Sequence, residues 1–178
     1  MKYTIILLIF IIYCYFKKIN FEKFENNNLT LTEKYIEIKY PLKYKILDNF
    51  IDKKDIQYII NKCKDYLQKS TIVNDNNDIS NWRTSKTTFI NYILGYNDPI
   101  LKKIINKVTK MLNISPEYIE EINLTYYNKG NQYKQHHDYF NPKLSNSEKE
   151  ILKKSGQRMK TIFVYLKNAI EGGETYFP

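Results

Sequence analysis

The most regular pattern in the chain is an apolar and aromatic run near its N-terminus. It extends from Tyr3 to Phe16, is interrupted only by Thr4, and has lysines on both sides. As a helix the run would rise about 21 Å against a hydrocarbon core of about 30 Å, and snorkelling lysines would offset part of the difference. We therefore expect residues 1–20 to form an uncleaved signal anchor. A cleaved signal peptide is the alternative, although no small-residue cleavage site follows the run.

The next segment is polar, with three consecutive asparagines at positions 26–28, and it predicts an exposed stalk over residues 21–34. Short strands are predicted over residues 35–40 and 44–47, on either side of Pro41. The domain itself is therefore expected to begin at residue 35.

Apolar positions then recur at helical spacing in two segments. The first predicts an amphipathic helix over residues 52–67, whose apolar face carries Ile56, Ile59, Ile60, Cys63 and Leu67. The second begins at Asp98-Pro99 and runs to Leu112, since proline is well tolerated in a first helical turn. We expect both helices to pack on a sheet.

Strand patterns dominate the second half of the chain. Residues 122–127 and 158–166 are predicted as strands, and a polar excursion with a short helix separates them over residues 141–155. Because helices come early and strands late, the pattern predicts an α+β fold. A chain of 178 residues suits one folded domain, which we place at residues 35–178.

The net charge of +9 changes this interpretation little, because it comes from a general richness in lysine. Arginine makes the bidentate contacts typical of phosphate and base recognition, but it occurs only as Arg83 and Arg158. We expect a solvated lysine-rich surface and no nucleic-acid partner. Binding to nucleic acid is the alternative, and it would weaken steeply with salt.

The candidate chemistry begins with His136 and Asp138, which lie two positions apart. On a strand such residues share a face, so both side chains can point at one metal while His137 faces away. Nitrogen and oxygen donors with open positions suit non-haem iron(II). Taken alone the pair is weak evidence, because a pair of this spacing also arises by chance on protein surfaces.

Several further blocks surround this pair in a fixed order. They are Ile46–Ile51 before the first helix, Arg83-Thr84-Ser85, Tyr127 with Gly130 and Tyr133, Arg158 with Thr161, and Gly172–Pro178. Over roughly Tyr40–Pro178 these blocks resemble the prolyl 4-hydroxylase family of iron(II)- and 2-oxoglutarate-dependent dioxygenases. The resemblance implies a double-stranded β-helix, or jelly-roll, core with supporting N-terminal helices.

The resemblance also implies a role for each matching residue. The metal ligands would be His136 and Asp138. The 2-oxoglutarate pocket would be lined by Tyr127, Thr161 and Tyr165. The peptide substrate would be approached by Arg83, Ser85, Tyr133 and Arg158. For the tyrosines the alternative is ordinary core packing, in a chain that has 17 of them.

One departure from the family concerns the metal. A facial site takes two histidines and one carboxylate, but the chain has only two histidines, His136 and His137, and they are adjacent. In the family the distal histidine and the basic residue that pairs with 2-oxoglutarate lie beyond the turn that ends here at Pro178. We expect a truncated chain with an incomplete jelly roll that is not a competent oxygenase as given.

The complete enzyme implied by the resemblance uses dioxygen, decarboxylates 2-oxoglutarate to succinate and hydroxylates prolyl residues of peptides or proteins, with ascorbate as reductant. We expect the anchor to cross a membrane once and the domain to lie in the lumen of the endoplasmic reticulum, although lysines at both ends of the run do not fix its orientation. Two rivals stay open. One is a hydroxylase acting on lysyl or other side chains, and the other is a degenerate, membrane-tethered binding module without catalysis.

Overall fold

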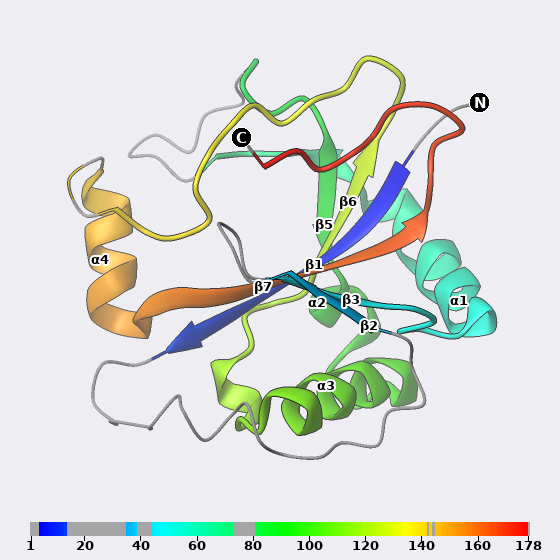
Figure 1. Ribbon diagram of the computed structural model, residues 1–178, viewed down its shortest axis with the longest axis horizontal. Helices are drawn as coiled ribbons and strands as arrows, with labels where there is room; N and C mark the ends of the chain where they lie inside the picture. The colour runs from blue at the N-terminus through cyan, green and yellow to red at the C-terminus, as the bar shows by residue number, and fades with distance from the viewer. Residues whose placement is uncertain are drawn as a thin grey trace.

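The protein is built around an antiparallel sheet with helices beside it (Figure 1). A computed structural model describes residues 4–13, 35–38, 44–72, 81–141, 143 and 145–177. The five-stranded sheet has the order β4 (Gln68–Lys69), β5 (Lys86–Phe89), β6 (Asn123–Tyr127), β1 (Thr4–Tyr13) and β7 (Gln157–Lys167). A separate two-stranded sheet pairs β2 (Tyr35–Ile38) with β3 (Tyr44–Leu47). These elements confirm the predicted α+β class.

The two long helices begin and end close to the predicted positions. They are α1 (Lys53–Cys63), which continues into the short helix η2 (Lys64–Tyr66), and α3 (Pro99–Leu112). Asp98 caps α3 by accepting hydrogen bonds from the backbone nitrogens of Ile100 and Leu101, at 2.8 and 3.0 Å. The Tyr58 hydroxyl donates to the same carboxylate at 2.7 Å and so ties α1 to the start of α3.

A single large hydrophobic cluster joins the helices to the sheet. Its buried members include Ile59 and Cys63 of α1, Leu101, Ile104 and Val108 of α3, Leu124 of β6 and Ile9 of β1. The remaining helical elements are α2 (Ile90–Leu94), η3 (Pro116–Tyr118) and α4 (Asn146–Ser155). Figure 1 shows α4 at the opposite end of the molecule from α1.

The N-terminal apolar run differs from the sequence prediction. Over Thr4–Tyr13 it is not a membrane helix but the strand β1, hydrogen-bonded to β6 on one side and β7 on the other. Ile6 and Ile9 lie three positions apart, hence on opposite faces of the strand, and each is buried in a different hydrophobic cluster. β-Branched apolar residues suit a central strand covered on both faces.

No helix within the described residues is long and apolar enough to cross a membrane. The rest of the predicted anchor and the stalk over residues 21–34 lie outside the described residues.

Candidate functional site

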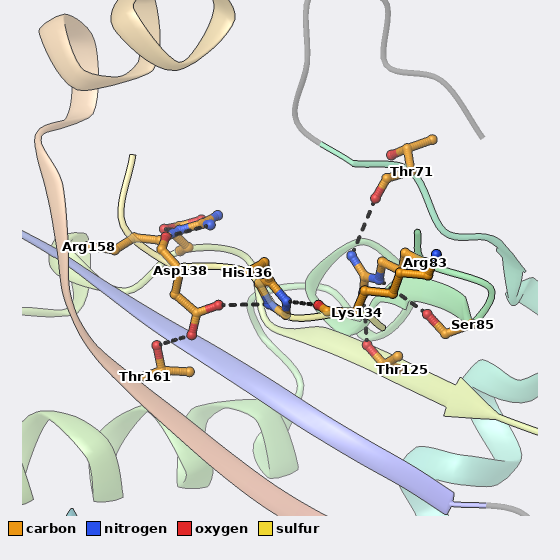
Figure 2. A network of polar contacts seen from close by, with 10 residues as sticks. Thr71, Arg83, Ser85, Thr125, Lys134, His136, Asp138, Arg158 and Thr161 are labelled. Atoms are coloured by element: carbon orange, nitrogen blue, oxygen red, sulfur yellow. Dashed lines mark hydrogen bonds and ion pairs between the residues drawn. The ribbon is translucent and has the colours of Figure 1, made fainter. Parts of the chain in front are cut away.

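His136 and Asp138 meet as the sequence predicts, but not on a strand. They lie in the loop that follows β6, where the last pairing is an isolated bridge between Tyr133 and Arg83. The His136 Nε2 atom is 3.4 Å from Asp138 Oδ1, and the two side chains are 33% and 29% exposed. His137 points elsewhere, with its ring 4.8 Å from that of Tyr139. The pair is therefore convergent and open to solvent (Figure 2).

Two contacts fix the orientation of the His136 ring. Its Nδ1 atom lies 2.7 Å from the carbonyl oxygen of Lys134. Because a carbonyl only accepts, Nδ1 must carry the proton, so Nε2 donates to Asp138 when the ring is charged and presents its lone pair when the ring is neutral. The Tyr133 ring stacks on the imidazole with centroids 3.5 Å apart. The ring nitrogen that faces Asp138 is thus the one able to bind a metal.

Asp138 is held by two residues of β7. The Thr161 hydroxyl donates to Asp138 Oδ2 at 2.7 Å, which leaves Oδ1 directed at His136. Arg158 Nη1 donates to the Asp138 backbone carbonyl at 3.3 Å. The loop that carries the candidate ligands is in this way fastened to the sheet.

Electrostatics within the pair favour a charged carboxylate. Burial works to raise the pKa of Asp138, but hydrogen bonds from His136 and Thr161 and the charges of His136 and Arg158 outweigh it and lower the pKa. Burial also works to lower the pKa of His136, yet the hydrogen bonds to Asp138 and to the Lys134 carbonyl raise it overall. A cation placed beside the pair would compete with the imidazole proton for the same oxygen.

Arg158 is engaged mainly with a carboxylate that the sequence did not single out. Its Nε and Nη2 atoms donate to the two carboxylate oxygens of Glu120 at 2.6 and 2.7 Å, and both side chains are only 17% exposed. The guanidinium carbon also lies 4.3 Å from the centroid of the Phe140 ring. These contacts favour a supporting role for Arg158, behind the loop of Asp138.

The three residues predicted to line a 2-oxoglutarate pocket all flank one strand. Tyr127 is the β6 partner of Thr4, whereas Tyr165 and Thr161 are the β7 partners of Ile6 and Phe10. The Tyr165 hydroxyl is hydrogen-bonded to that of Thr175 in the segment after β7. Strand β1 therefore sets the spacing between the hydroxyls of β6 and those of β7.

The residues predicted to contact a peptide are unequally accessible. Ser85 is 1% exposed and bonds to the Ser70 hydroxyl at 2.8 Å. Arg83 is half-buried against β5 and β6, and its guanidinium carbon lies 4.8 Å from the centroid of Tyr133. Tyr133 contacts both Arg83 and His136. Substitution of Tyr133 or Arg83 would therefore alter the surroundings of the candidate metal ligand His136.

The described residues supply only part of the ligand set that an iron(II) site needs. Within the described residues no group of three or more histidine, cysteine, aspartate or glutamate side chains gathers around one point. His136 and Asp138 supply one nitrogen and one oxygen donor, a set that fits iron(II) chemically but leaves the facial arrangement one protein donor short.

Sequence comparison places this site in context. The chain is 33% identical to probable prolyl 4-hydroxylase 8 of Arabidopsis thaliana over 136 residues, which cover 75% of this chain and 44% of that protein. It is 32% identical to prolyl 4-hydroxylase 2 of the same plant over 136 residues, covering 75% of this chain and 42% of the relative. Prolyl 4-hydroxylase 5 of the same plant is 26% identical over 147 residues, which cover 82% of this chain and 48% of that protein.

The chain thus spans a little under half the length of these curated relatives. No family model and no solved structure matches it. The similarity to several prolyl 4-hydroxylases nevertheless extends over three quarters or more of the chain. The chain therefore belongs to the prolyl 4-hydroxylase family.

Proposed function

We propose that this protein is an iron(II)- and 2-oxoglutarate-dependent dioxygenase of prolyl 4-hydroxylase type that acts on prolyl residues of peptides or proteins. One observation carries the proposal. His136 Nε2 and Asp138 Oδ1 face one another at 3.4 Å, each held by its own hydrogen bond, in a chain related to prolyl 4-hydroxylases.

In this proposal His136 and Asp138 hold the metal, and Tyr127 and Tyr165 offer hydroxyl donors to the co-substrate. Thr161 orients the Asp138 carboxylate through the 2.7 Å hydrogen bond between them. Iron(II), 2-oxoglutarate and dioxygen supply the oxidising chemistry when bound, with ascorbate as reductant. The role of this chain is to hold two donors at fixed angles and to keep hydroxyl groups beside them.

The proposal includes a jelly-roll core and a further histidine ligand. Since His136 and His137 are the only histidines of this chain, that ligand would come from sequence that the chain does not contain. Its relatives are more than twice as long as the segments they share with it.

Membrane attachment and a lumenal domain in the endoplasmic reticulum also belong to the proposal. An anchor would need the same residues that form strand β1. Residues 4–13 cannot lie in the bilayer and between β6 and β7 at once. Expression in a eukaryotic secretory system followed by carbonate extraction tests the anchor. Retention in the membrane with the N-terminus intact supports it, and recovery in the supernatant contradicts it.

The catalytic proposal is tested by succinate release and hydroxyproline formation. We compare the 178-residue chain with a chimera that adds the C-terminal half of prolyl 4-hydroxylase 2. Little turnover is expected from the chain alone. The chimera should turn over proline-rich peptides in an iron-dependent way, His136→Ala should abolish this activity, and His137→Ala should spare most of it. Turnover that survives His136→Ala would contradict the proposal. Activity on lysyl peptides alone would show that the side chain hydroxylated is lysine and not proline.

A second candidate, a non-catalytic binding module, is favoured by the presence of only two gathered metal donors among the described residues. It predicts peptide binding by the 178-residue chain that does not depend on iron. The first candidate predicts binding that strengthens when iron is added.

A further inference from the structure

Gln157, the first residue of β7, makes a two-way contact with the loop that carries the candidate metal ligands. Its side-chain oxygen Oε1 accepts a hydrogen bond from the backbone nitrogen of Phe140 at 2.7 Å, and its Nε2 donates to the Phe140 carbonyl at 2.9 Å. The backbone nitrogen of Arg158 donates to the same Oε1 at 3.0 Å. Two N–H donors at one atom and a carbonyl acceptor at the other show which end of the amide is the oxygen.

This contact does the work of backbone pairing at a place where no strand is paired. In an antiparallel sheet, two facing residues can exchange both of their N–H···O bonds. Gln157 exchanges the same two bonds with Phe140 through its side chain, beyond the Arg83–Tyr133 bridge at which the pairing of this segment stops. Phe140 is only 3% exposed, so water offers its backbone groups little compensation if the amide is lost.

Other contacts hold the same stretch of backbone. The Phe140 ring lies against Arg158, whose guanidinium carbon is 4.3 Å from the ring centroid, and Glu120 fixes that guanidinium with two hydrogen bonds. The next backbone nitrogen, that of Asn141, donates to Glu148 of α4 at 2.7 Å. Phe140 is therefore a fixed point of the loop, joined to β7 through Gln157.

This fixed point lies two residues after the candidate metal ligand Asp138. Two residues of extended chain span at most about 7 Å, so the position of Phe140 limits where Asp138 can lie. The Arg158 Nη1 atom then reaches the Asp138 carbonyl at 3.3 Å, and the Thr161 hydroxyl reaches its carboxylate at 2.7 Å (Figure 2). Both contacts require the loop to lie against β7, and the Gln157 amide holds it there.

We propose that Gln157 is a positioning residue of the candidate metal site. Its side-chain amide holds Phe140 against β7, and Phe140 in turn keeps Asp138 where its carboxylate faces His136. Gln157 acts through Asp138 and is not itself a ligand. This inference rests on the proposed function, because it assigns Gln157 a role toward the metal of that site.

The test is the dissociation constant of Co(II), measured by calorimetry on the 178-residue chain and its Gln157→Leu variant. Leucine has a similar size but forms no hydrogen bond, so Phe140 loses both contacts with the amide. We expect Co(II) binding to weaken about 10- to 100-fold, as is usual when a residue that orients a metal ligand is lost. The matched control is Gln57→Leu, which removes a glutamine hydrogen bond of 2.9 Å to Asn61 within α1 and should bind Co(II) as the wild type does.

A second background separates positioning from a general loss of structure. In Asp138→Asn the carboxylate is gone, so adding Gln157→Leu should change the dissociation constant by less than about twofold. A loss of equal size with and without the Asp138 carboxylate would overturn the positioning role.

If Gln157→Leu does not fold, Gln157→Glu serves instead. Glutamate keeps an acceptor for the Phe140 N–H group and loses only the donor to the Phe140 carbonyl. Binding of Co(II) should still weaken several-fold, although the added negative charge would by itself attract the cation.

The possible outcomes separate this inference from the proposed function. Wild-type affinity for Co(II) in Gln157→Leu or Gln157→Glu would overturn the role of Gln157 and leave the proposed function standing. A wild-type chain that binds no Co(II) would overturn the proposed metal site, and the role of Gln157 with it.

Discussion

Thr161 is the side chain on which the orientation of Asp138 depends most directly. Its hydroxyl occupies Oδ2 at 2.7 Å and thereby leaves Oδ1 facing His136. We expect Thr161→Val to free the carboxylate and to weaken Co(II) binding about 10- to 100-fold, as is usual when a residue that orients a metal ligand is lost. Anaerobic titration of Co(II) measures this. Thr88→Val on β5 is the control, and an equal loss in that variant would show that any threonine of the sheet has the same effect.

Residues of the site were predictable where local spacing carries the information. His136 and Asp138 are two positions apart, and the ordered blocks around them mark them as a pair. Glu120 was missed because its link to Arg158 joins positions 38 apart and no local pattern marks it. Thr125 was missed because its sequence context is that of an ordinary strand residue. The hydrogen bond from Arg83 to its hydroxyl depends on the tertiary fold.

Among the elements, α3 begins where the Asp98-Pro99 sequence predicts a helix N-terminus. Asp98 caps the helix through the backbone nitrogens of Ile100 and Leu101 and also accepts from Tyr58 of α1. We expect Asp98→Ala to lower the free energy of unfolding by about 0.5–2 kcal/mol for the cap, with a further loss from the unpaired Tyr58 hydroxyl. Urea denaturation measures the change. Asn97→Ala, one position outside the cap, should stay within about 0.5 kcal/mol, and an equal effect there would contradict the capping role.

Other element boundaries could not be predicted from neighbouring residues in the sequence. β5 passes directly into α2 at Ile90, without a glycine or proline to mark the change. The convergence of His136 and Asp138 was argued from the geometry of a strand, but strand pairing stops at the Arg83–Tyr133 bridge and the pair lies in a loop. The two side chains still meet, since a loop with bent backbone can direct neighbouring residues to one point as well as a strand does.

For the molecule as a whole, the position of β1 is the feature that the sequence did not predict over Thr4–Tyr13. Periodicity does not separate a buried strand from an apolar helix when nearly every position is apolar. The pairing also depends on partners far along the chain, such as Leu124 for Leu7 and Ile162 for Ile9. Without β1, β6 and β7 have no common neighbour in the sheet.

Stability measurements distinguish a strand from an anchor at these residues. Ile9 is fully buried in the main hydrophobic cluster, so Ile9→Ala should lower the free energy of unfolding by about 2–5 kcal/mol. Ile170 is 82% exposed, and Ile170→Ala should change it by no more than about 0.5 kcal/mol. If both variants unfold like the wild type, β1 does not contribute to the folded domain, and the membrane prediction gains support.

Anaerobic Fe(II) titration of the 178-residue chain shows whether His136 and Asp138 act as the metal-binding pair that we propose. With two protein donors the wild type should bind Fe(II) weakly but measurably. His136→Ala and Asp138→Asn should each weaken binding by at least about tenfold. His137→Ala should bind as the wild type does, because its ring lies against Tyr139 and away from the pair. Binding that survives the loss of His136, or that His137→Ala abolishes, would rule out His136 and Asp138 as the metal ligands.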